Sequence, residues 1–203
     1  MIAIIDYEAG NLTSVERALN YLGVSCKITA HAGEILASDR VIFPGVGAAG
    51  KSMEVIRLKK LDRVIHEVIQ AHTPFLGICL GAQIVLGSSA EDDVACLGEI
   101  SGKAKKFPSM GLKVPHMGWN NISIVRHHPV LHGIDPGAQF YFVHSYYPAP
   151  DRTRDVIATT TYGIEFASVI GKENVVATQF HPEKSGRYGL MLLKNFSEWD
   201  GTM

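Results

Sequence analysis

The chain has 203 residues, of which 46% are hydrophobic and 19% charged, and its formal net charge is −1. These values are typical of a soluble globular protein, and the balanced charge gives no reason to expect a nucleic acid or an anionic membrane as a partner. No apolar run is long enough for a membrane span, and no signal-peptide pattern opens the chain. Cys26, Cys79 and Cys96 are too few for a disulfide framework. We therefore expect one domain over residues 1–203, in the cytoplasm, where a free thiol persists.

The N-terminal half alternates strand and helix patterns. Thr13 to Glu16 predicts a capping box before a helix that Gly23 ends. Pro74 marks a boundary before a buried apolar run that reaches Cys79. This alternation predicts a parallel sheet with helices on both faces. The other elements expected are strands over 1–6, 24–29 and 40–43 and one long amphipathic helix over 51–72.

The pattern changes after residue 95, where short strand-like runs are joined by turns. No repeat or linker separates the two halves, so we expect their strands to share one sheet. The fold class predicted is α/β, with an open, mixed, mostly parallel sheet flanked by helices and an antiparallel extension in the C-terminal half. The elements expected are strands over 113–115, 139–144, 155–160, 165–170 and 174–180 and a closing helix over 186–199.

Cys79 lies in Gly77-Ile78-Cys79-Leu80-Gly81, where a predicted strand passes into a predicted helix. This is the pattern of a nucleophile elbow, with cysteine in place of serine. The flanking glycines would allow a strained turn and a close backbone approach. A thiol at a helix N-terminus can be held partly as thiolate. A buried cysteine is otherwise a small core residue, so the pattern alone leaves both interpretations open.

Phe180-His181-Pro182-Glu183 favours the catalytic interpretation. The preceding apolar strand delivers His181 and Glu183 at its carboxyl end, where open α/β sheets place their sites. His181 would act as the base and Glu183 would orient it, as in a nucleophile–histidine–acid triad. The sequence thus predicts covalent acyl transfer at Cys79.

Pro44-Gly45-Val46-Gly47 directly follows the third predicted strand and should lie beside the elbow. We expect backbone N–H groups of Gly45, Val46 and Gly47, together with that of Leu80, to form an oxyanion hole. The alternative is a simple turn.

Gly-Ile-Cys-Leu-Gly-Ala-Gln together with His-Pro-Glu resembles the triad-type, class I glutamine amidotransferases, whose fold is flavodoxin-like. Four further runs are similar to the glutaminase subunits of imidazole glycerol phosphate synthases, and together the matches extend along the whole chain. These runs are Gly10–Val15, Lys113–Asn120, Phe140–Tyr146 and Gln179–Ser185.

The resemblance implies that Cys79 attacks the side-chain amide of L-glutamine, that His181 protonates the departing ammonia, and that water releases glutamate from a thioester. It also implies a heterodimer with a barrel-shaped cyclase subunit. Ammonia would pass through that subunit to N1-(phosphoribulosyl)formimino-AICAR ribonucleotide, yielding imidazole glycerol phosphate and AICAR in histidine biosynthesis. Activity would stay low until the partner binds its substrate and the Val46 peptide rotates to complete the oxyanion hole. Neither a cofactor nor a metal is expected.

The resemblance also assigns residues around the triad. Gln83 would hold the carboxylate or the amino end of glutamine, and Glu91 would pair with its ammonium, although the acidic run at Glu91 also fits a solvated loop. His144, Ser145 and Tyr146 would line the pocket. Four residues would contact the partner subunit: Asn11, Ser14, Trp119 and Lys184.

Glu8 departs from the family pattern, which has glycine there, and adds a charge to a loop expected at the interface.

Three other functions remain open at this point. The chain resembles, less closely, the glutaminase subunits for anthranilate or pyridoxal phosphate synthesis. A catalytically silent binding module on the same fold would not need intact Cys79, His181 and Glu183. A cysteine peptidase would not need residues that grip a free amino acid.

Overall fold

The computed structural model describes residues 1–8, 11–109 and 111–202. An eight-stranded sheet runs through the molecule in the order β2-β1-β3-β4-β14-β13-β12-β9. The first five strands in this order are mutually parallel, and the last three are antiparallel to their neighbours. The predicted mixed α/β sheet is confirmed. The strands are β1 (Ile2–Ile5), β2 (Cys26–Thr29), β3 (Arg40–Gly45), β4 (Phe75–Cys79), β9 (Ser123–Ile124), β12 (Val156–Tyr162), β13 (Ile164–Lys172) and β14 (Val175–Thr178).

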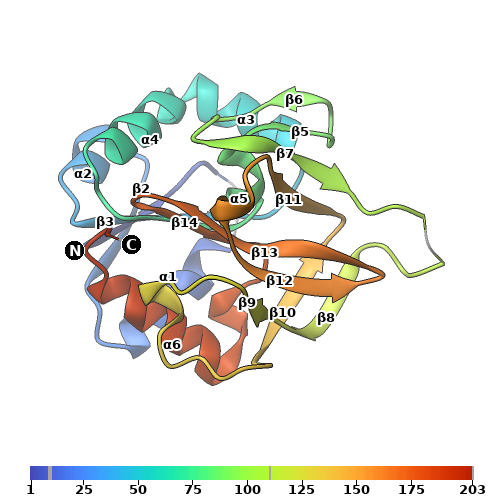
Figure 1. Cartoon of the computed structure of the whole chain (residues 1–203). Helices are drawn as coiled ribbons and strands as arrows, with labels where there is room; N and C mark the ends of the chain where they lie inside the picture. Colours follow the sequence, from blue (N-terminus) through green and yellow to red (C-terminus); the bar gives the residue numbers. More distant parts are fainter. Residues whose placement is uncertain (9–10, 110, 203) are drawn as a thin grey trace.

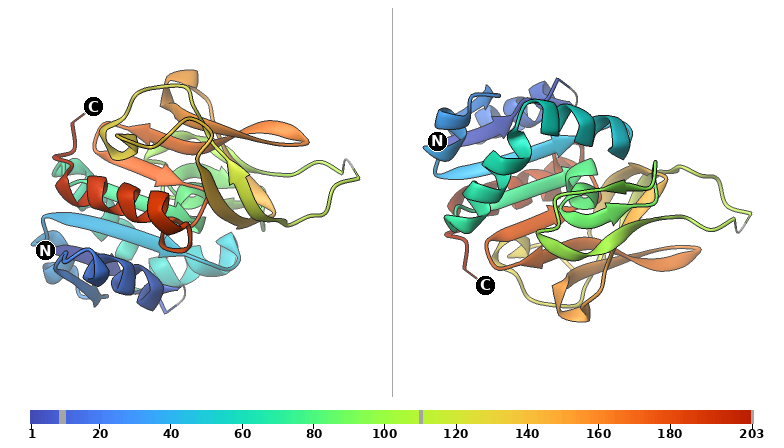
Figure 2. Two further views of the ribbon diagram at one scale, coloured as in Figure 1. Left: turned by 90° about the horizontal axis from the view of Figure 1, so that it is seen from below. Right: turned by 90° about the horizontal axis from the view of Figure 1, so that it is seen from above.

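Helices cover both faces of this sheet (Figures 1 and 2). One face packs on α1 (Leu12–Tyr21) and α6 (Gly186–Glu198), and the other on α2 (Ala32–Leu36), α3 (Ala49–Leu58) and α4 (Leu61–Gln70). Two separate clusters of buried apolar side chains result, one on each face. β1, β4 and β14 are buried along their whole length, which explains why they are almost entirely apolar. The remaining helices are short: α5 (Leu80–Ile84), η1 (Pro129–Leu131), η2 (Thr153–Asp155) and η3 (Pro182–Lys184).

Strands of both halves share the main sheet, as expected, but two smaller sheets lie beside it. β8 (His116–Asn121) pairs with β10 (Gln139–His144). The other sheet has the order β11-β7-β5-β6. Its strands are β5 (Leu86–Ser89), β6 (Val94–Ala95), β7 (Ile100–Lys106) and β11 (Tyr146–Pro150). The described residues between β7 and β8 project from the body (Figure 2).

Three local predictions differ from the structure. The helix expected over 51–72 is two helices, because Lys60 adopts a left-handed conformation (φ 57°) between α3 and α4. The capping box at Thr13 is wrong: the N-cap of α1 is Asn11, two residues earlier, and its Oδ1 accepts from the Ser14 hydroxyl instead of from a backbone N–H. The strand expected over 113–115 is also absent, since β8 begins at His116, directly after a cis Val114–Pro115 bond.

Glu8 also has a left-handed backbone (φ 66°), a conformation that glycine adopts without strain. Its carboxylate lies 2.8 Å from the Lys59 ammonium and is exposed to solvent. Gly23 likewise has a positive φ of 70° and ends α1 as predicted. Among the described residues, no helix has the length and apolar character needed to cross a membrane.

Candidate active site

Cys79 lies at the carboxyl end of β4, at the sharp turn into α5. Its φ of 55° and ψ of −100° are strained for a residue with a side chain, as a nucleophile elbow requires. The turn leaves no room beside it: a Cβ on Gly77 would lie 2.8 Å from the Gly81 carbonyl carbon, and one on Gly81 would lie 2.5 Å from the Phe43 oxygen. The flanking glycines are therefore needed for close backbone packing, as the sequence indicated. The α5 helix itself has only five residues, so its dipole acts on Cys79 over a single turn.

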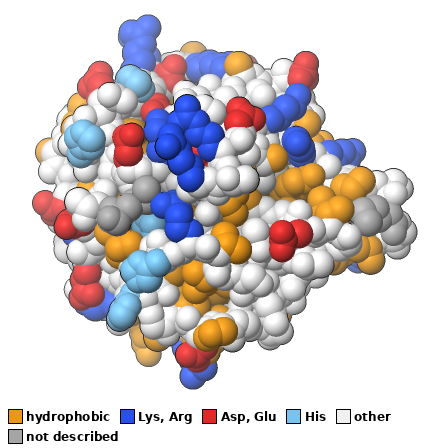
Figure 3. Space-filling model, viewed as in Figure 1, with side chains coloured by type: hydrophobic (Ala, Val, Ile, Leu, Met, Phe, Trp, Pro, Cys, Tyr) orange, Lys and Arg blue, Asp and Glu red, His pale blue; other side chains and the backbone are white. Residues whose placement is uncertain are grey.

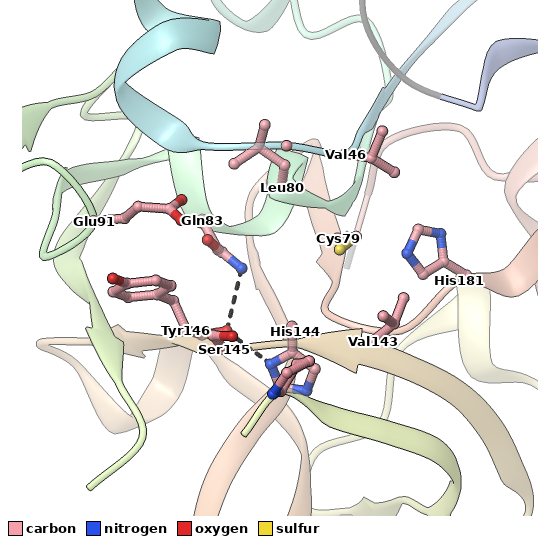
Figure 4. Close-up of a pocket in the computed structure, with 12 residues that line it drawn as sticks. Val46, Cys79, Leu80, Gln83, Glu91, Val143, His144, Ser145, Tyr146 and His181 are labelled. Carbon is pink, nitrogen blue, oxygen red and sulfur yellow. Dashed lines mark hydrogen bonds between the residues drawn. The ribbon is translucent and has the colours of Figure 1, made fainter. Parts of the chain in front are cut away.

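His181 faces the sulfur from the neighbouring strand end. β14 pairs in parallel with β4, with Thr178 opposite Ile78, so the chain after β14 reaches the same sheet edge as Cys79. One imidazole nitrogen of His181 points toward the sulfur (Figure 4). The other, Nδ1, lies 2.8 Å from Glu183 Oε1. The three side chains are thus in the order expected of a nucleophile, base and orienting acid.

The electrostatics of this group favour a protonated histidine. Burial lowers the pKa of His181, but the interactions with Cys79 and Glu183 outweigh burial and raise that pKa to about 10. His181 and Glu183 are almost completely shielded from solvent, with side-chain exposures of 2% and 1%. Removal of either partner would leave a charge buried without compensation.

Gln179 is a neighbour of the sulfur that the sequence analysis did not single out. Its Nε2 lies 3.6 Å from Cys79 Sγ and donates a hydrogen bond to it, and the side chain is completely buried. The only sequence signal was its place two residues before His181, inside a run that resembles the family. A donor at this position stabilises negative charge on sulfur.

The residues expected to form the oxyanion hole surround the elbow. Gly45 is paired with Cys79 in the β3–β4 register, and Leu80 is the first residue of α5. Val46 is 37% exposed, and Gly47 has a φ of 106°. The buried hydroxyl of Tyr7 lies beneath this turn and has no normal hydrogen bond to a described residue. Burial is the main cause that raises the pKa of Tyr7.

A cavity of about 330 Å³ opens beside Cys79 and His181. All five residues expected to bind substrate line this cavity, although Gln83 and Glu91 come from the N-terminal half and the others from the β10–β11 connection. These five are Gln83, Glu91, His144, Ser145 and Tyr146. Figure 4 shows them around the space in front of the sulfur.

The amide of Gln83 has a fixed orientation. Its Nε2 donates to the Tyr146 carbonyl at 3.2 Å and to Gln179 Oε1 at 3.1 Å. Both N–H groups are therefore used, and Oε1, an acceptor, is the atom left for a ligand. An acceptor fits the ammonium end of an amino acid, not its carboxylate.

Glu91 supports the same polarity. Its Oε2 accepts from the Ala49 N–H at 2.8 Å, which leaves Oε1 without that partner. Burial raises the pKa of Glu91, against the lowering effect of the Ala49 N–H. Glu91, for which a solvated acidic loop was the alternative, thus contributes a half-buried carboxylate to the pocket wall.

The predicted interface residues are exposed or half-buried. Lys184 is exposed, and its ammonium is 6.0 Å from the centre of the Tyr141 ring. Trp119 is 54% exposed, and its ring centre is 6.2 Å from that of Tyr141. Asn11 and Ser14 begin α1. No cluster of three or more metal-ligating His, Cys, Asp or Glu side chains is present in the part of the chain that the structure describes.

Comparisons with known proteins identify the family of this chain. The family model for class-I glutamine amidotransferases matches residues 3–198. An imidazole glycerol phosphate synthase subunit HisH from Nitratidesulfovibrio vulgaris is 51% identical, over 97% of this chain and 95% of the relative. A protein of the same name from Dehalococcoides mccartyi is 47% identical, over 97% and 96%.

Solved structures share the fold at low sequence identity. The structure of PurLQS from Thermotoga maritima superposes with a TM-score of 0.73 at 15% identity, covering 96% of each chain. A crystal structure of a glutamine amidotransferase gives a TM-score of 0.70 at 18% identity, covering 96% of this chain and all of the other. The extent of the family match and the half-identical relatives show that this chain belongs to the class-I glutamine amidotransferases.

Proposed function

We propose that this chain hydrolyses glutamine through Cys79, His181 and Glu183. The Cys79 thiolate attacks the δ-carbonyl carbon of glutamine, and the protonated His181 gives its proton to the departing ammonia. The C–N bond breaks and a γ-glutamyl thioester remains on Cys79. Neutral His181 then takes a proton from water, whose oxygen attacks the thioester carbonyl, and glutamate leaves as the thiolate is restored.

The observation that carries this proposal is the His181 ring, which lies between the Cys79 sulfur and the Glu183 carboxylate and opens onto a cavity. The cavity also accounts for the choice of substrate. Gln83 Oε1 and the Glu91 carboxylate present acceptors for the α-ammonium of a free amino acid. A peptidase would have to accommodate a continuing chain at this end, which the paired acceptors oppose.

The name of the half-identical relatives supports a more specific role. We assign the chain to the synthase that makes imidazole glycerol phosphate, as its glutaminase subunit. Its partner would be a barrel-shaped cyclase that receives ammonia and converts N1-(phosphoribulosyl)formimino-AICAR ribonucleotide to imidazole glycerol phosphate and AICAR. We place this reaction in the cytoplasm, where the thiol of Cys79 stays reduced.

The surface around the pocket mouth supports a protein partner. Met117, Trp119 and Val46 are exposed apolar side chains on segments that line or adjoin the site. Hydrophobic side chains are visible at the base of the projecting segment in Figure 3. Lys184 is the cation next to this group, suited to a carboxylate on the partner. Tryptophan and other large side chains in such positions are typical anchors of interfaces.

The gating of the site by its partner rests on Val46. Val46 lines the pocket together with Cys79 and follows Gly45, which pairs with Cys79. Rotation of the Val46 peptide would redirect the N–H toward the oxyanion, a donor typically worth about 3–4 kcal/mol, or a rate factor of roughly 100 to 1,000. A chain that hydrolyses glutamine as fast alone as in the complex would contradict this gating.

Cys79→Ala tests the proposed function in the complex with the cyclase. Glutamine-dependent synthesis should disappear, and synthesis supplied with ammonium salts should continue at a near-normal rate. Loss of both activities would show that Cys79 is structural. Co-purification with an anthranilate or pyridoxal phosphate enzyme, instead of the cyclase, would favour the alternative amidotransferases.

A further inference from the structure

Two buried histidines outside the triad, His116 and His144, lie opposite each other on β8 and β10. Their rings are joined by a 3.0 Å contact between His116 Nδ1 and His144 Nε2. A contact between two imidazole nitrogens requires one donor and one acceptor. Which nitrogen carries the proton follows from the partners at the two ends of the pair.

The first end is fixed by Asn120. Its Oδ1 accepts from the Asn121 backbone N–H at 2.8 Å, and its Nδ2 donates to the Thr161 carbonyl at 3.0 Å. These two backbone partners set the orientation of the amide, so the atom that lies 3.2 Å from His116 Nε2 is the NH2 donor. His116 Nε2 must therefore be unprotonated, and the proton of the neutral ring is on Nδ1.

The second end is fixed by the Tyr146 carbonyl, which can only accept. His144 Nδ1 lies 2.7 Å from this oxygen, so Nδ1 carries the proton and Nε2 accepts from His116. Both ends demand the same arrangement, in which every donor meets an acceptor. An additional proton would have to occupy Nε2 of either ring, where it would face the N–H of Asn120 or of His116. Burial also lowers the pKa of His116 to about 4 and that of His144 to about 3.

The Tyr146 carbonyl links this pair to the pocket. It accepts from His144 Nδ1 and also from Gln83 Nε2, so both of its lone pairs are engaged. Gln83 in turn donates to Gln179, which donates to the Cys79 sulfur. A continuous run of hydrogen bonds therefore extends from β8 to the nucleophile.

We propose that Asn120, His116 and His144 form a relay of fixed tautomers that positions the Tyr146 carbonyl and thereby holds Gln83 with its oxygen toward the substrate ammonium. This inference deepens the proposed function and rests on it. Asn120 and His116 touch neither substrate nor sulfur in this assignment, and they act as positioning residues.

The relay also connects the pocket with the outer side of β8. Side chains alternate along a strand, so Met117 and Trp119 face outward while His116 and Asn120 face the relay. A partner that contacts Met117 and Trp119 and shifts β8 would also move His116 and Asn120, the two relay residues on that strand. Glutamine binding and partner docking are coupled in this way without any change at the triad.

Nitrogen NMR of the isolated wild-type chain, labelled at histidine, tests the relay directly. At pH 7 both His116 and His144 should be neutral and protonated on Nδ1, with unprotonated Nε2. Either ring protonated on Nε2, or doubly protonated, would overturn the proposal. Asn120→Asp places an acceptor against His116 Nε2 and should draw a proton to that nitrogen, whereas Asn121→Asp on the same strand should leave both tautomers unchanged.

Kinetics supply the second readout. His116→Phe keeps a ring in the stack between Phe142 and Tyr162 but removes the donor to His144. In the complex with the cyclase, the KM for glutamine should rise roughly 10-fold while kcat changes less than about twofold, because only ground-state positioning is lost. The rate at which iodoacetamide alkylates Cys79 should not change. An unchanged KM, or a lower kcat without a KM effect, would refute the relay.

His128→Phe is the matched control, because His128 is also buried and makes an edge-to-face contact with Trp199, and it does not line the pocket. It should leave KM unchanged. Failure of the proposed function would appear separately, as glutamine hydrolysis that persists in Cys79→Ala. The tautomer measurement in the wild type needs no folded variant and decides the relay by itself.

Discussion

The edge of the main sheet and the two small sheets contribute different parts of the site. Cys79 and His181 lie at the ends of neighbouring parallel strands, where the sheet fixes their separation. His144 and Tyr146 come from β10 and β11 in the small sheets. The reactive groups are thus buried at the edge of the main sheet. His144 and Tyr146 of the pocket wall belong to the small sheets, which also contain the exposed Trp119.

The pKa values of buried histidines are shifted in opposite directions in the two regions. Ionic neighbours raise the pKa of His181 despite its burial, whereas burial lowers the pKa values of His116 and His144. Burial alone therefore does not determine the role of a histidine. Next to Cys79 and Glu183, the His181 ring is favoured in its protonated form, which can donate a proton. Between the Asn120 amide and the Tyr146 carbonyl, the neutral rings of His116 and His144 form the proposed relay.

The largest effect is expected at the sheet edge. His181→Ala should reduce glutamine-dependent kcat by roughly 10⁴-fold, because it removes both the acid and the base. Ammonia-dependent synthesis by the complex should remain. His132→Ala, at an exposed histidine, is the control for general effects of the substitution. A decrease of less than tenfold would mean that another group transfers the proton.

A smaller loss is expected from the orienting acid. Glu183→Gln keeps an acceptor near His181 Nδ1 but removes the charge, and should lower kcat by roughly 100-fold. Steady-state assays of glutamine hydrolysis measure this, with the exposed Glu198→Gln as control. If Glu183→Gln were as inactive as His181→Ala, the carboxylate would have a role beyond orientation.

Gln179→Leu should have a moderate effect, because it removes one weak hydrogen bond to the sulfur and one to Gln83. We expect glutamine-dependent kcat/KM to fall about 10-fold and the rate of Cys79 alkylation near neutral pH to fall with it. The exposed Gln70→Leu on α4 is the matched control. Alkylation at the wild-type rate would show that Gln179 does not stabilise the thiolate.

The smallest expected effect is the pH dependence of the free energy of unfolding. The folded-state pKa of His181 is raised to about 10, so its contribution to stability is complete below about pH 6.5 and is lost as the pH rises toward 10. The pKa values of His116 and His144, about 4 and 3, give the opposite sign: their contribution is present above about pH 6.5 and is lost as the pH falls.

Urea unfolding across this pH range, in parallel with histidine NMR, separates the two windows. The alkaline loss should shrink in His181→Gln, and the acidic loss should shrink in His116→Phe. A His181 ring that loses its proton below pH 7 would contradict the raised pKa of His181.

The sequence predicted the main-sheet edge well, for physical reasons. Apolar runs identify β4 and β14 because both are buried on two sides, and the glycines around Cys79 reflect contacts closer than a side chain permits. Parallel strands then bring Cys79 and His181 together without further information. The confirmed mixed α/β class follows from the same patterns.

The small sheets were less predictable. β10 lies at its predicted residues, 139–144, but β5 and β6 have only four and two residues, and β5, β6 and β7 lack a clear alternation. The break between α3 and α4 depends on the left-handed conformation of Lys60, and no glycine at that position indicates it in the sequence. Gln179 and His116 act through partners that are distant in the chain, so their contacts become visible only in three dimensions.

The most direct test is covalent. A glutamine-analogue electrophile, 6-diazo-5-oxo-norleucine, should modify one thiol per chain in the complex, and peptide mass spectrometry should place the adduct on Cys79, with Cys26 and Cys96 unmodified. The adduct should be absent in Cys79→Ala and slow to form in His181→Ala. An adduct on Cys26 or Cys96, or a wild-type chain that hydrolyses glutamine with Cys79 unmodified, would contradict the account.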